Sequence, residues 1–481
     1  MVGVRRTRAR IGLGSVLTLL AVLTTVVTAA PGSAERESDG GSNVASPTVT
    51  GPVTGGKGSP SIADDLSQLP AFNYVQQEYF IEGDAHAYGK VGTWTTNGTW
   101  AATPTTSAHY KTRIVVRRPA DAKKFNGTVV VEWLNVSAGF DAGPDWGFGR
   151  TELLRDGYAW VGVSAQFVGV DGPAVGIAGL APLKKTDPVR YASLVHPGDR
   201  YSYDIFSQAG QAIRHPDGTN PLAGLRPRKL LAAGESQSAF RMVTYVNAVD
   251  PLARVYDGFL VHSRFASGAP IFDGPGGDVP APSHVRTDLR VPVLVFESET
   301  DVGLEWRARQ PDNPRFRQWE VTGTAHADAY LVPAAALPLL GCTVHINEGP
   351  EHWVVHTAIA DLRRWVTDDD FRPPHSPRIV VDGNGTIVRD QFGNARGGIR
   401  TPQLDVPIAT LSGQNNDHGF CGLFGQTIPF NAQTLASLYP THDVYVGKFE
   451  RATDRAQDRG FLLPVDARGI ETIARTAPIP H

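Results

Sequence analysis

The sequence contains few cysteines and little charge. Only two of its 481 residues are cysteine, which excludes a small scaffold held together by several disulfides. Charged residues make up 19% of the chain, 45 basic against 48 acidic, for a formal net charge of −3. Nucleic-acid-binding proteins usually carry a strongly basic surface, so we expect no nucleic acid partner. With 41% hydrophobic residues, the chain can bury a large core as one big domain or as two smaller ones.

The N-terminal apolar stretch, residues 11–30, is followed by no cysteine, which argues against a lipoprotein. It comes after four arginines and before small residues that end at Ala34, an order typical of a secretory signal peptide. The alternative is an uncleaved anchor helix, although glycines and threonines dilute the stretch. No second membrane span is evident. We predict a signal peptide over 1–34, a flexible leader rich in Gly, Ser and Pro over 35–60, and a secreted, extracellular protein with no stable membrane insertion after cleavage.

The two cysteines, Cys342 and Cys421, are expected to form a disulfide, because an isolated pair in an exported chain is usually bridged. Closing a loop of this length stabilises a fold by about 4.5 kcal/mol at most in the chain-entropy model. The alternative, a cysteine nucleophile, is the weaker interpretation, because neither residue has a setting that would lower the thiol pKa.

Residues 61–375 alternate short apolar runs with helical patterns, which predicts an α/β domain with a mainly parallel sheet flanked by helices. Apolar residues recur at helical spacing over 201–213, 239–249 and 355–366. Beyond residue 375, prolines, turn residues and short strand-like pieces indicate an appended C-terminal region, 376–481, packed on this core. The predicted strands are Thr112–Arg117, Thr128–Leu134, Ala159–Ala165, Lys229–Ala233, Gly258–His262, Val291–Glu297 and Arg317–Val321.

Ser236 lies where the strand Lys229–Ala233 turns into a helix, within Gly234-Glu235-Ser236-Gln237-Ser238. Small residues two before and two after a serine allow the strained turn of a nucleophile elbow, which exposes the hydroxyl above the sheet. Ser238 occupies the position at which this motif usually has its second glycine. The alternative interpretation of such a short pattern is a tight turn with no catalytic role.

An acid and a histidine follow Ser236 in the chain, each after a predicted strand. Serine, then acid, then histidine at the ends of successive parallel strands is the order of an α/β-hydrolase triad. His326 would accept the serine proton, and a carboxylate would orient its ring. Asp301 and Glu299 are both candidates for the acid, and we favour Asp301. For either acid the alternative is a solvated turn or a helix cap, and for His326 a surface histidine.

A tetrahedral intermediate needs two backbone N–H groups aimed at its oxyanion. We expect one from Gln237, which follows the nucleophile, and one from Asn135 or Val136, which follow the strand Thr128–Leu134. There is no HGGG run. Aromatic residues in nearby loops either line an apolar pocket or belong to the core; these are Trp133, Phe140, Trp146, Phe148 and Phe167.

The combination of several short motifs resembles the α/β-hydrolase-domain family of bacterial, often exported, proteins. The segments that carry the resemblance are 132–137 (EWLNVS), 234–238 (GESQS), 299–302 (ETDV), 323–328 (GTAHAD) and 393–402 (GNARGGIRTP). The resemblance covers about residues 60–475 and implies a serine-hydrolase fold with Ser236, His326 and an acid at Asp301 or Glu299. It does not identify a substrate, because one fold serves many functions.

We therefore predict a secreted serine hydrolase that cleaves a small-molecule or polymeric carboxylic ester, with no metal and no organic cofactor. An amidase or acyltransferase could use the same triad, and an inactive binding protein on a hydrolase scaffold is the alternative from another class. A metallohydrolase using His352 and His356 is less favoured, since no glutamate follows the first histidine as in zinc-protease helices. The sequence does not indicate an oligomeric state.

Overall fold

The computed structural model describes residues 42–173, 180–272 and 279–479, so the predicted signal peptide, residues 1–34, lies outside the described residues. The main sheet contains ten strands in the order β10-β9-β8-β7-β4-β5-β3-β2-β1-β6. These are β1 (Thr48–Thr50), β2 (Tyr74–Val91), β3 (Ala101–Pro119), β4 (Thr128–Trp133), β5 (Ala159–Val163), β6 (Asp217–Gly218), β7 (Lys229–Glu235), β8 (Gly258–His262), β9 (Val293–Ser298) and β10 (Phe316–Val321).

Six neighbouring strands, β10, β9, β8, β7, β4 and β5, pair in parallel, which confirms the predicted α/β architecture. They are buried along almost their whole length, as expected for strands that are covered on both faces. All seven predicted strands are present, and Thr112–Arg117 is the inner part of the longer β3. Because the carboxyl ends of parallel strands meet at one edge, the residues that follow β7, β9 and β10 are brought together.

A long antiparallel ribbon of β2 and β3 continues the sheet beyond β5, and most of it was not predicted from the sequence. The two strands have 18 and 19 residues and pair from Tyr74–Pro119 to Val91–Ala101, with a bulge between His86 and Tyr88. The outer part of β3 is mostly exposed and polar. No continuous apolar run therefore marks these strands in the sequence.

The segment predicted as a flexible leader, residues 35–60, contributes a strand to the sheet. Thr48–Thr50 pairs antiparallel with β2 and parallel with β6. Val49 is 2% exposed and packs into the large core. The prediction of a flexible leader therefore does not hold for Thr48–Thr50, since pairing with distant strands orders a segment whose own composition favours disorder.

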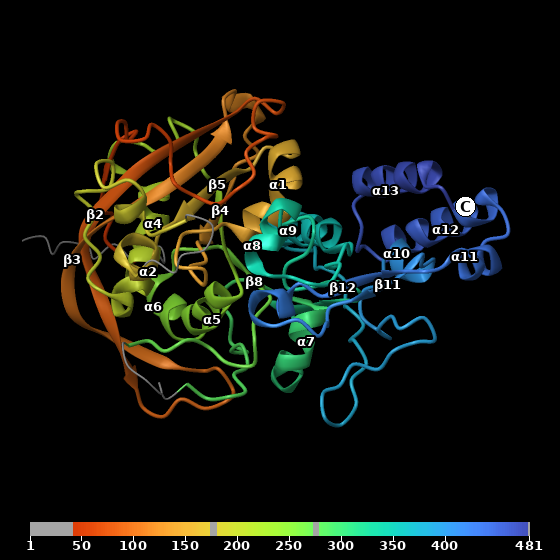
Figure 1. Ribbon diagram of the computed structural model, residues 1–481. Helices are drawn as coiled ribbons and strands as arrows, with labels where there is room; N and C mark the ends of the chain where they lie inside the picture. Colours follow the sequence, from red (N-terminus) through yellow and green to blue (C-terminus); the bar gives the residue numbers. More distant parts are fainter. Residues whose placement is uncertain (1–41, 174–179, 273–278, 480–481) are drawn as a thin grey trace, which may run out of the picture. The chain divides into compact units, whose positions relative to one another are not determined.

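Helices cover both faces of the sheet (Figure 1). Helices α4 and α5 share one apolar core with Val129 and Val131 of β4, and α1 and α9 share the other core with Val130. The three predicted helical segments are confirmed. The helices are α1 (Pro144–Arg155), α2 (Phe167–Asp171), α3 (Leu183–Thr186), α4 (Ser202–Arg214), α5 (Gln237–Thr244), α6 (Asp250–Ala253), α7 (Glu299–Glu305), α8 (Leu337–Leu340), α9 (Glu351–Thr367), α10 (Pro402–Asp405), α11 (Ala432–Leu438), α12 (His442–Asp458) and α13 (Pro464–Thr476).

The C-terminal region contains α10 to α13 and a second sheet of two antiparallel strands, β11 (Ala409–Ser412) and β12 (Gln426–Pro429). Helices α12 and α13 pack against each other and enclose a small apolar core of their own. Asp466 of α13 connects this region to the large domain, because its carboxylate pairs with Arg155 of α1 and lies 3.0 Å from His356 Nδ1 of α9. The C-terminal layer therefore packs on helices that belong to the predicted core.

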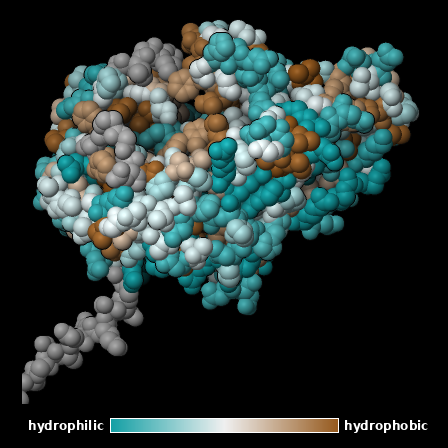
Figure 2. Space-filling model, turned by 90° about the horizontal axis from the view of Figure 1, so that it is seen from below, coloured by the Kyte–Doolittle hydropathy of each residue, from teal (hydrophilic) through white to brown (hydrophobic). Residues whose placement is uncertain are grey.

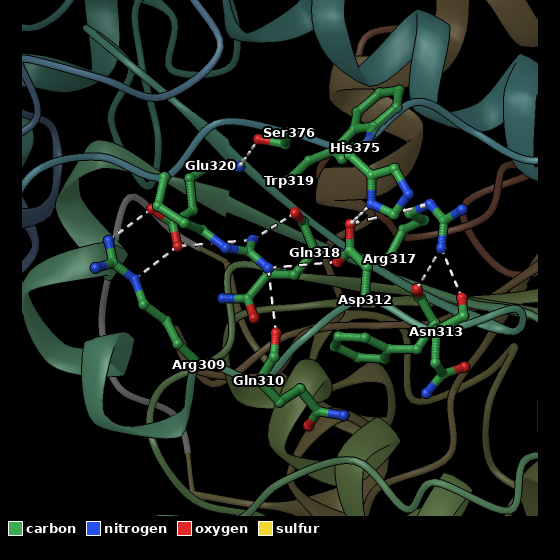
Figure 3. Close-up of polar contacts among 12 residues, drawn as sticks. Arg309, Gln310, Asp312, Asn313, Arg317, Gln318, Trp319, Glu320, His375 and Ser376 are labelled. Carbon is green, nitrogen blue, oxygen red and sulfur yellow. Dashed lines mark hydrogen bonds and ion pairs between the residues drawn. The ribbon is translucent and has the colours of Figure 1, made fainter.

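The start of the same layer covers the edge strand β10 (Figure 3). Glu320 of β10 accepts hydrogen bonds from Arg309 (2.7 Å) and from the backbone N–H of Ile379 (2.7 Å). Ile399 donates its N–H to the Glu320 carbonyl (2.7 Å) and accepts from the Thr322 N–H (3.0 Å). Gly398 has φ +66°, and a Cβ there would clash with Thr322 Oγ1. The glycine-rich segment is thus a packing turn against β10.

The surface in Figure 2 is mostly hydrophilic, with hydrophobic residues in several separate groups. Among the described residues, no helix combines the length and the apolar character that crossing a bilayer requires.

Candidate active site

Ser236 stands at the sharp turn between β7 and α5. Its backbone has φ +58° and ψ −122°, a conformation that residues other than glycine rarely adopt. A Cβ at Gly234 would lie 3.0 Å from Met242 Cγ and 3.2 Å from Ser238 Cβ, so the turn needs a glycine at 234 and a small residue at 238. Ser238 is fully buried and satisfies this need. The backbone of a nucleophile elbow is therefore present, with serine in place of the usual second glycine.

The three side chains expected from the chain order meet at the carboxyl edge of the sheet. His326 follows β10, and its Nε2 lies 2.7 Å from Ser236 Oγ. Its Nδ1 lies 2.7 Å from Oδ1 of Asp301, which is in the first turn of α7 after β9. Ser298 donates its hydroxyl to the other oxygen of Asp301 at 2.6 Å. The exposed fractions are 9% for Ser236, 5% for His326 and 0% for Asp301, so two short hydrogen bonds link a serine, an imidazole and a carboxylate in a nearly dry setting.

Burial and charge act in opposite directions on these groups. Burial disfavours the protonated ring of His326, but the carboxylates of Asp301 and Glu235 outweigh it and raise the pKa of His326 to about 9. For Asp301, burial opposes ionisation, yet the charge and hydrogen bond of His326 and the hydroxyl of Ser298 hold the pKa below its usual value. An ionised aspartate beside an imidazole that readily takes a proton is the arrangement by which a serine hydroxyl is activated.

Glu299, the alternative acid of the sequence analysis, has other partners. Its carboxylate accepts the backbone N–H groups of Gly323 (2.8 Å) and Gly413 (3.1 Å) and lies 3.0 Å from Arg389. Gly413 and Arg389 belong to the C-terminal layer, so Glu299 joins that layer to the end of β10. The structure therefore brings Asp301, and not Glu299, to His326.

The predicted oxyanion donors differ in whether their backbone N–H groups already donate a hydrogen bond within the protein. The backbone N–H of Asn135 donates to the Ala142 carbonyl at 2.9 Å, so the expectation that Asn135 supplies a backbone donor is not met. The cause is a bridge between the two ends of the loop after β4, which the sequence pattern does not reveal. The backbone N–H groups of Val136 and Gln237 donate no hydrogen bond to any described residue. They are the pair that remains for an oxyanion.

A carboxylate next to the serine was missed by sequence reasoning. Glu235, the residue before Ser236, places Oε1 3.1 Å from His326 Nε2, the same atom that faces the serine hydroxyl. Burial raises the pKa of Glu235 to about 8, although the charge of His326 acts in the opposite direction. The side-chain amide of Asn135 donates to the Glu235 carbonyl at 3.2 Å. In the sequence, the one signal for this contact was the position of Glu235 inside the G-x-S-x motif.

A second histidine, His262, lies behind the serine and was not predicted. Its backbone carbonyl accepts the N–H of Ser236 at 3.0 Å. Its fully buried ring lies between two carboxylates, with Nδ1 2.9 Å from Asp145 and Nε2 3.1 Å from Glu351. Burial opposes protonation, but both carboxylates raise the pKa of His262 well above its usual value. The end of β8, where His262 lies, is at the same sheet edge, so its position was the signal that could have identified it.

A pocket of about 500 Å³ opens beside Ser236 and His326. Its polar lining comes from Asn135, Ser137, the segment 235–237 and His326. The remaining lining residues are apolar or glycine, and several come from segments far along the chain. Of the aromatic residues considered from the sequence, Phe140 lines the pocket. Trp133, Trp146 and Phe148 are core residues, and Phe167 is 37% exposed and meets the ring of His196 edge to face.

Two further predictions concern residues away from the serine. Cys342 and Cys421 form the predicted disulfide. His352 stacks on Tyr330, with ring centroids 3.9 Å apart, and His356 is fully buried beside Asp466. No group of three or more His, Cys, Asp or Glu side chains within the described ranges is arranged to hold a metal ion. His352 thus packs on Tyr330 of the large domain, and His356 lies where α9 meets α13.

Comparison with known proteins places these features in a family. A search of curated proteins found no match to the chain. Among solved structures, an α/β serine hydrolase from Xanthomonas campestris is 10% identical, with 53% of this chain and 94% of that chain covered and a TM-score of 0.29. A fungal esterase from Rhizomucor miehei is 13% identical, with coverage of 63% and 89% and a TM-score of 0.29. The model of the family described as alpha/beta hydrolase domain matches residues 49–472, and the chain therefore belongs to that family.

Proposed function

We propose that this protein is a serine hydrolase that cleaves carboxylic esters through a covalent acyl-enzyme. The observation that carries the proposal is the pair of 2.7 Å hydrogen bonds that join Asp301 to His326 and His326 to Ser236, with the serine on a strained turn. A serine hydroxyl is a weak nucleophile unless an oriented base removes its proton, and this geometry supports His326 in that role.

The reaction would proceed in two similar halves. His326 Nε2 takes the proton from Ser236 Oγ as the oxygen attacks the ester carbonyl, and Asp301 stabilises the imidazolium that forms. The backbone N–H groups of Gln237 and Val136 are the donors left for the oxyanion. Collapse of the tetrahedral intermediate, with the proton returned from His326 to the leaving alcohol, gives the acyl-enzyme. Water then repeats the sequence and releases the acid.

The disulfide supports a place outside the cytoplasm for the mature protein, because such bonds persist in oxidising compartments. We propose that the protein is secreted after removal of residues 1–34. The check is the N-terminal sequence of the protein recovered from the culture medium of its natural host.

The test of the chemistry is intact-mass labelling with a fluorophosphonate, with hydrolysis of p-nitrophenyl acetate as a parallel measurement. We expect one adduct on the native chain, none on Ser236→Ala, and much slower labelling of His326→Ala. Ser238→Ala, which keeps a small residue at the neighbouring position, is the matched control and should still be labelled. A folded native protein that forms no adduct would contradict the proposal and favour an inactive binding protein. Hydrolysis of p-nitroacetanilide faster than that of the ester would instead indicate an amidase, and transfer to an added alcohol that outpaces hydrolysis would indicate an acyltransferase.

A further inference from the structure

The pocket beside Ser236 changes character along its length. Its polar groups all belong to the residues around the serine hydroxyl, namely Asn135, Ser137, the segment 235–237 and His326. The rest of the described lining is apolar or glycine, with no lysine, arginine or aspartate. A buried charge or unpaired hydroxyl costs free energy in such surroundings. The far part of the pocket therefore matches a hydrocarbon group, and it offers no partners for a sugar or a carboxylate.

Two segments that are distant in sequence form much of the apolar wall. Ala336, Leu339 and Leu340 come from the segment 334–342, and Phe420, Leu423 and Phe424 come from 419–424 in the C-terminal layer. We call these two segments the lip. Leu423 accepts the backbone N–H of Ala327, the residue after His326, at 3.4 Å. The lip is thus continuous with the loop that carries the histidine.

Several bonds fix the two halves of the lip to each other. The Cys342–Cys421 disulfide joins them directly. Asp417 accepts the backbone N–H and the hydroxyl of Thr343 at 2.8 and 2.6 Å. Asn347 donates its backbone N–H to the Phe424 carbonyl at 2.9 Å. A wall held in this way presents a defined apolar shape, and its residues cannot move apart freely to admit any substrate.

We propose that the pocket selects carboxylic esters with an uncharged, medium-length apolar group, and that the lip is the element that selects them. This inference rests on the proposed function. A pocket of about 500 Å³ is within the size range of sites that enclose a drug-sized ligand, so it exceeds what an acetyl group needs. Each methylene buried in the pocket should raise kcat/KM by up to about fourfold.

The first experiment compares p-nitrophenyl acetate, butyrate and octanoate with mono-p-nitrophenyl suberate. The suberate ester has the chain length of the octanoate ester but ends in a carboxylate, so it isolates the effect of charge. We expect kcat/KM to rise from acetate to octanoate and to be at least tenfold lower for suberate than for octanoate. Equal kcat/KM values for acetate and octanoate, or for octanoate and suberate, would overturn the inference.

The second experiment changes the lip. Leu339→Asn alters a lip leucine that is 70% exposed, so the fold should tolerate it, and Leu423→Asn alters a half-buried one. The matched control is Leu304→Asn on α7, where the leucine is 56% exposed and outside the pocket. Both lip variants should lower the ratio of octanoate to acetate hydrolysis by about threefold or more, and the control should keep it. A ratio that the lip variants leave unchanged, or that the control lowers equally, would overturn the role of the lip.

The two proposals fail in different ways. If the pocket inference alone is wrong, acetate is hydrolysed and the fluorophosphonate adduct forms, but there is no preference for apolar esters. If the serine chemistry is wrong, no ester is hydrolysed. In that case binding of octanamide to the native chain, measured by calorimetry against acetamide, still tests the pocket. Tighter binding of octanamide supports the apolar pocket, and equal binding overturns it.

Discussion

Replacing Asp301 by asparagine should separate the role of this carboxylate from that of its neighbours. The substitution keeps the shape of the side chain but removes the charge that lies 2.7 Å from His326 Nδ1. The pKa of His326 is raised from 6.5 to about 9 against the opposing effect of burial, and Asp301 is the first of the groups that raise it. This shift corresponds to about 3 kcal/mol in favour of the imidazolium.

The imidazolium forms as the serine attacks. A substitution that makes the imidazolium less stable therefore lowers the reaction rate. We expect Asp301→Asn to lower kcat/KM for p-nitrophenyl acetate by about 10²- to 10⁴-fold, the larger value applying if the ring also adopts the wrong tautomer. The rising limb of kcat/KM against pH should also move to lower pH, because the substitution removes the first of the groups that raise the pKa of His326 while burial continues to lower it.

Glu299→Gln is the matched control, since Glu299 lies on the same turn, is buried, and binds Arg389 and two backbone N–H groups instead of the histidine. It should lower the unfolding temperature without moving the pH limb. Rates are to be compared at equal folded fractions, measured by circular dichroism. An Asp301→Asn variant within tenfold of the native rate, or a Glu299→Gln variant with the larger loss, would refute the assignment.

Three further predictions concern stability. Cys342→Ser with Cys421→Ser should lower the free energy of unfolding by at most about 4.5 kcal/mol, measured by urea denaturation, and reductant should add no further loss in that variant. Burial lowers the pKa of His352 and His356, so the contribution of these two residues to stability should be complete above pH ~6.5 and fall below it, because the unfolded chain takes up these protons first. Thermal unfolding from pH 8 to 5 checks this, and a His352→Phe variant with an unchanged slope would contradict it. Asp466→Asn should destabilise the chain by up to about 3 kcal/mol, since the partly buried Arg155 is left with Glu152 as its carboxylate partner and His356 loses the charge beside its Nδ1.

Apolar runs and chain order made much of this fold and site predictable. Strands such as β4 and β8 are buried on both faces, so each contains a run of consecutive apolar residues, 129–131 and 259–261, that stands out in the sequence. Ser236, Asp301 and His326 follow β7, β9 and β10, and the topology brings the ends of these strands to one edge of the sheet. The ribbon of β2 and β3 was largely not predicted because much of its length is exposed or half-buried and its fully buried stretches are short.

Contacts between distant loops explain the rest. Glu299 and Asp301 are two residues apart, and only the fold shows that one faces Gly413 and the other His326. Asn135 lost its backbone N–H to Ala142, seven residues along the chain. The hydrogen bonds of the His262 ring are made with carboxylates at the starts of α1 and α9. No local sequence pattern links those two residues to His262.

The backbone hydrogen bonds along β10, at the edge of the large sheet, affect where the chain can be truncated. Ile399 pairs with Val321 and satisfies backbone groups that β10 would otherwise present to solvent. A polypeptide ending at residue 375 would leave that strand as an open template for pairing with another molecule, and Arg309 would have to share Glu320 with water. The span 61–375 therefore relies on the C-terminal layer to cover its edge strand. Recombinant fragments that stop there should self-associate, whatever chemistry their serine retains.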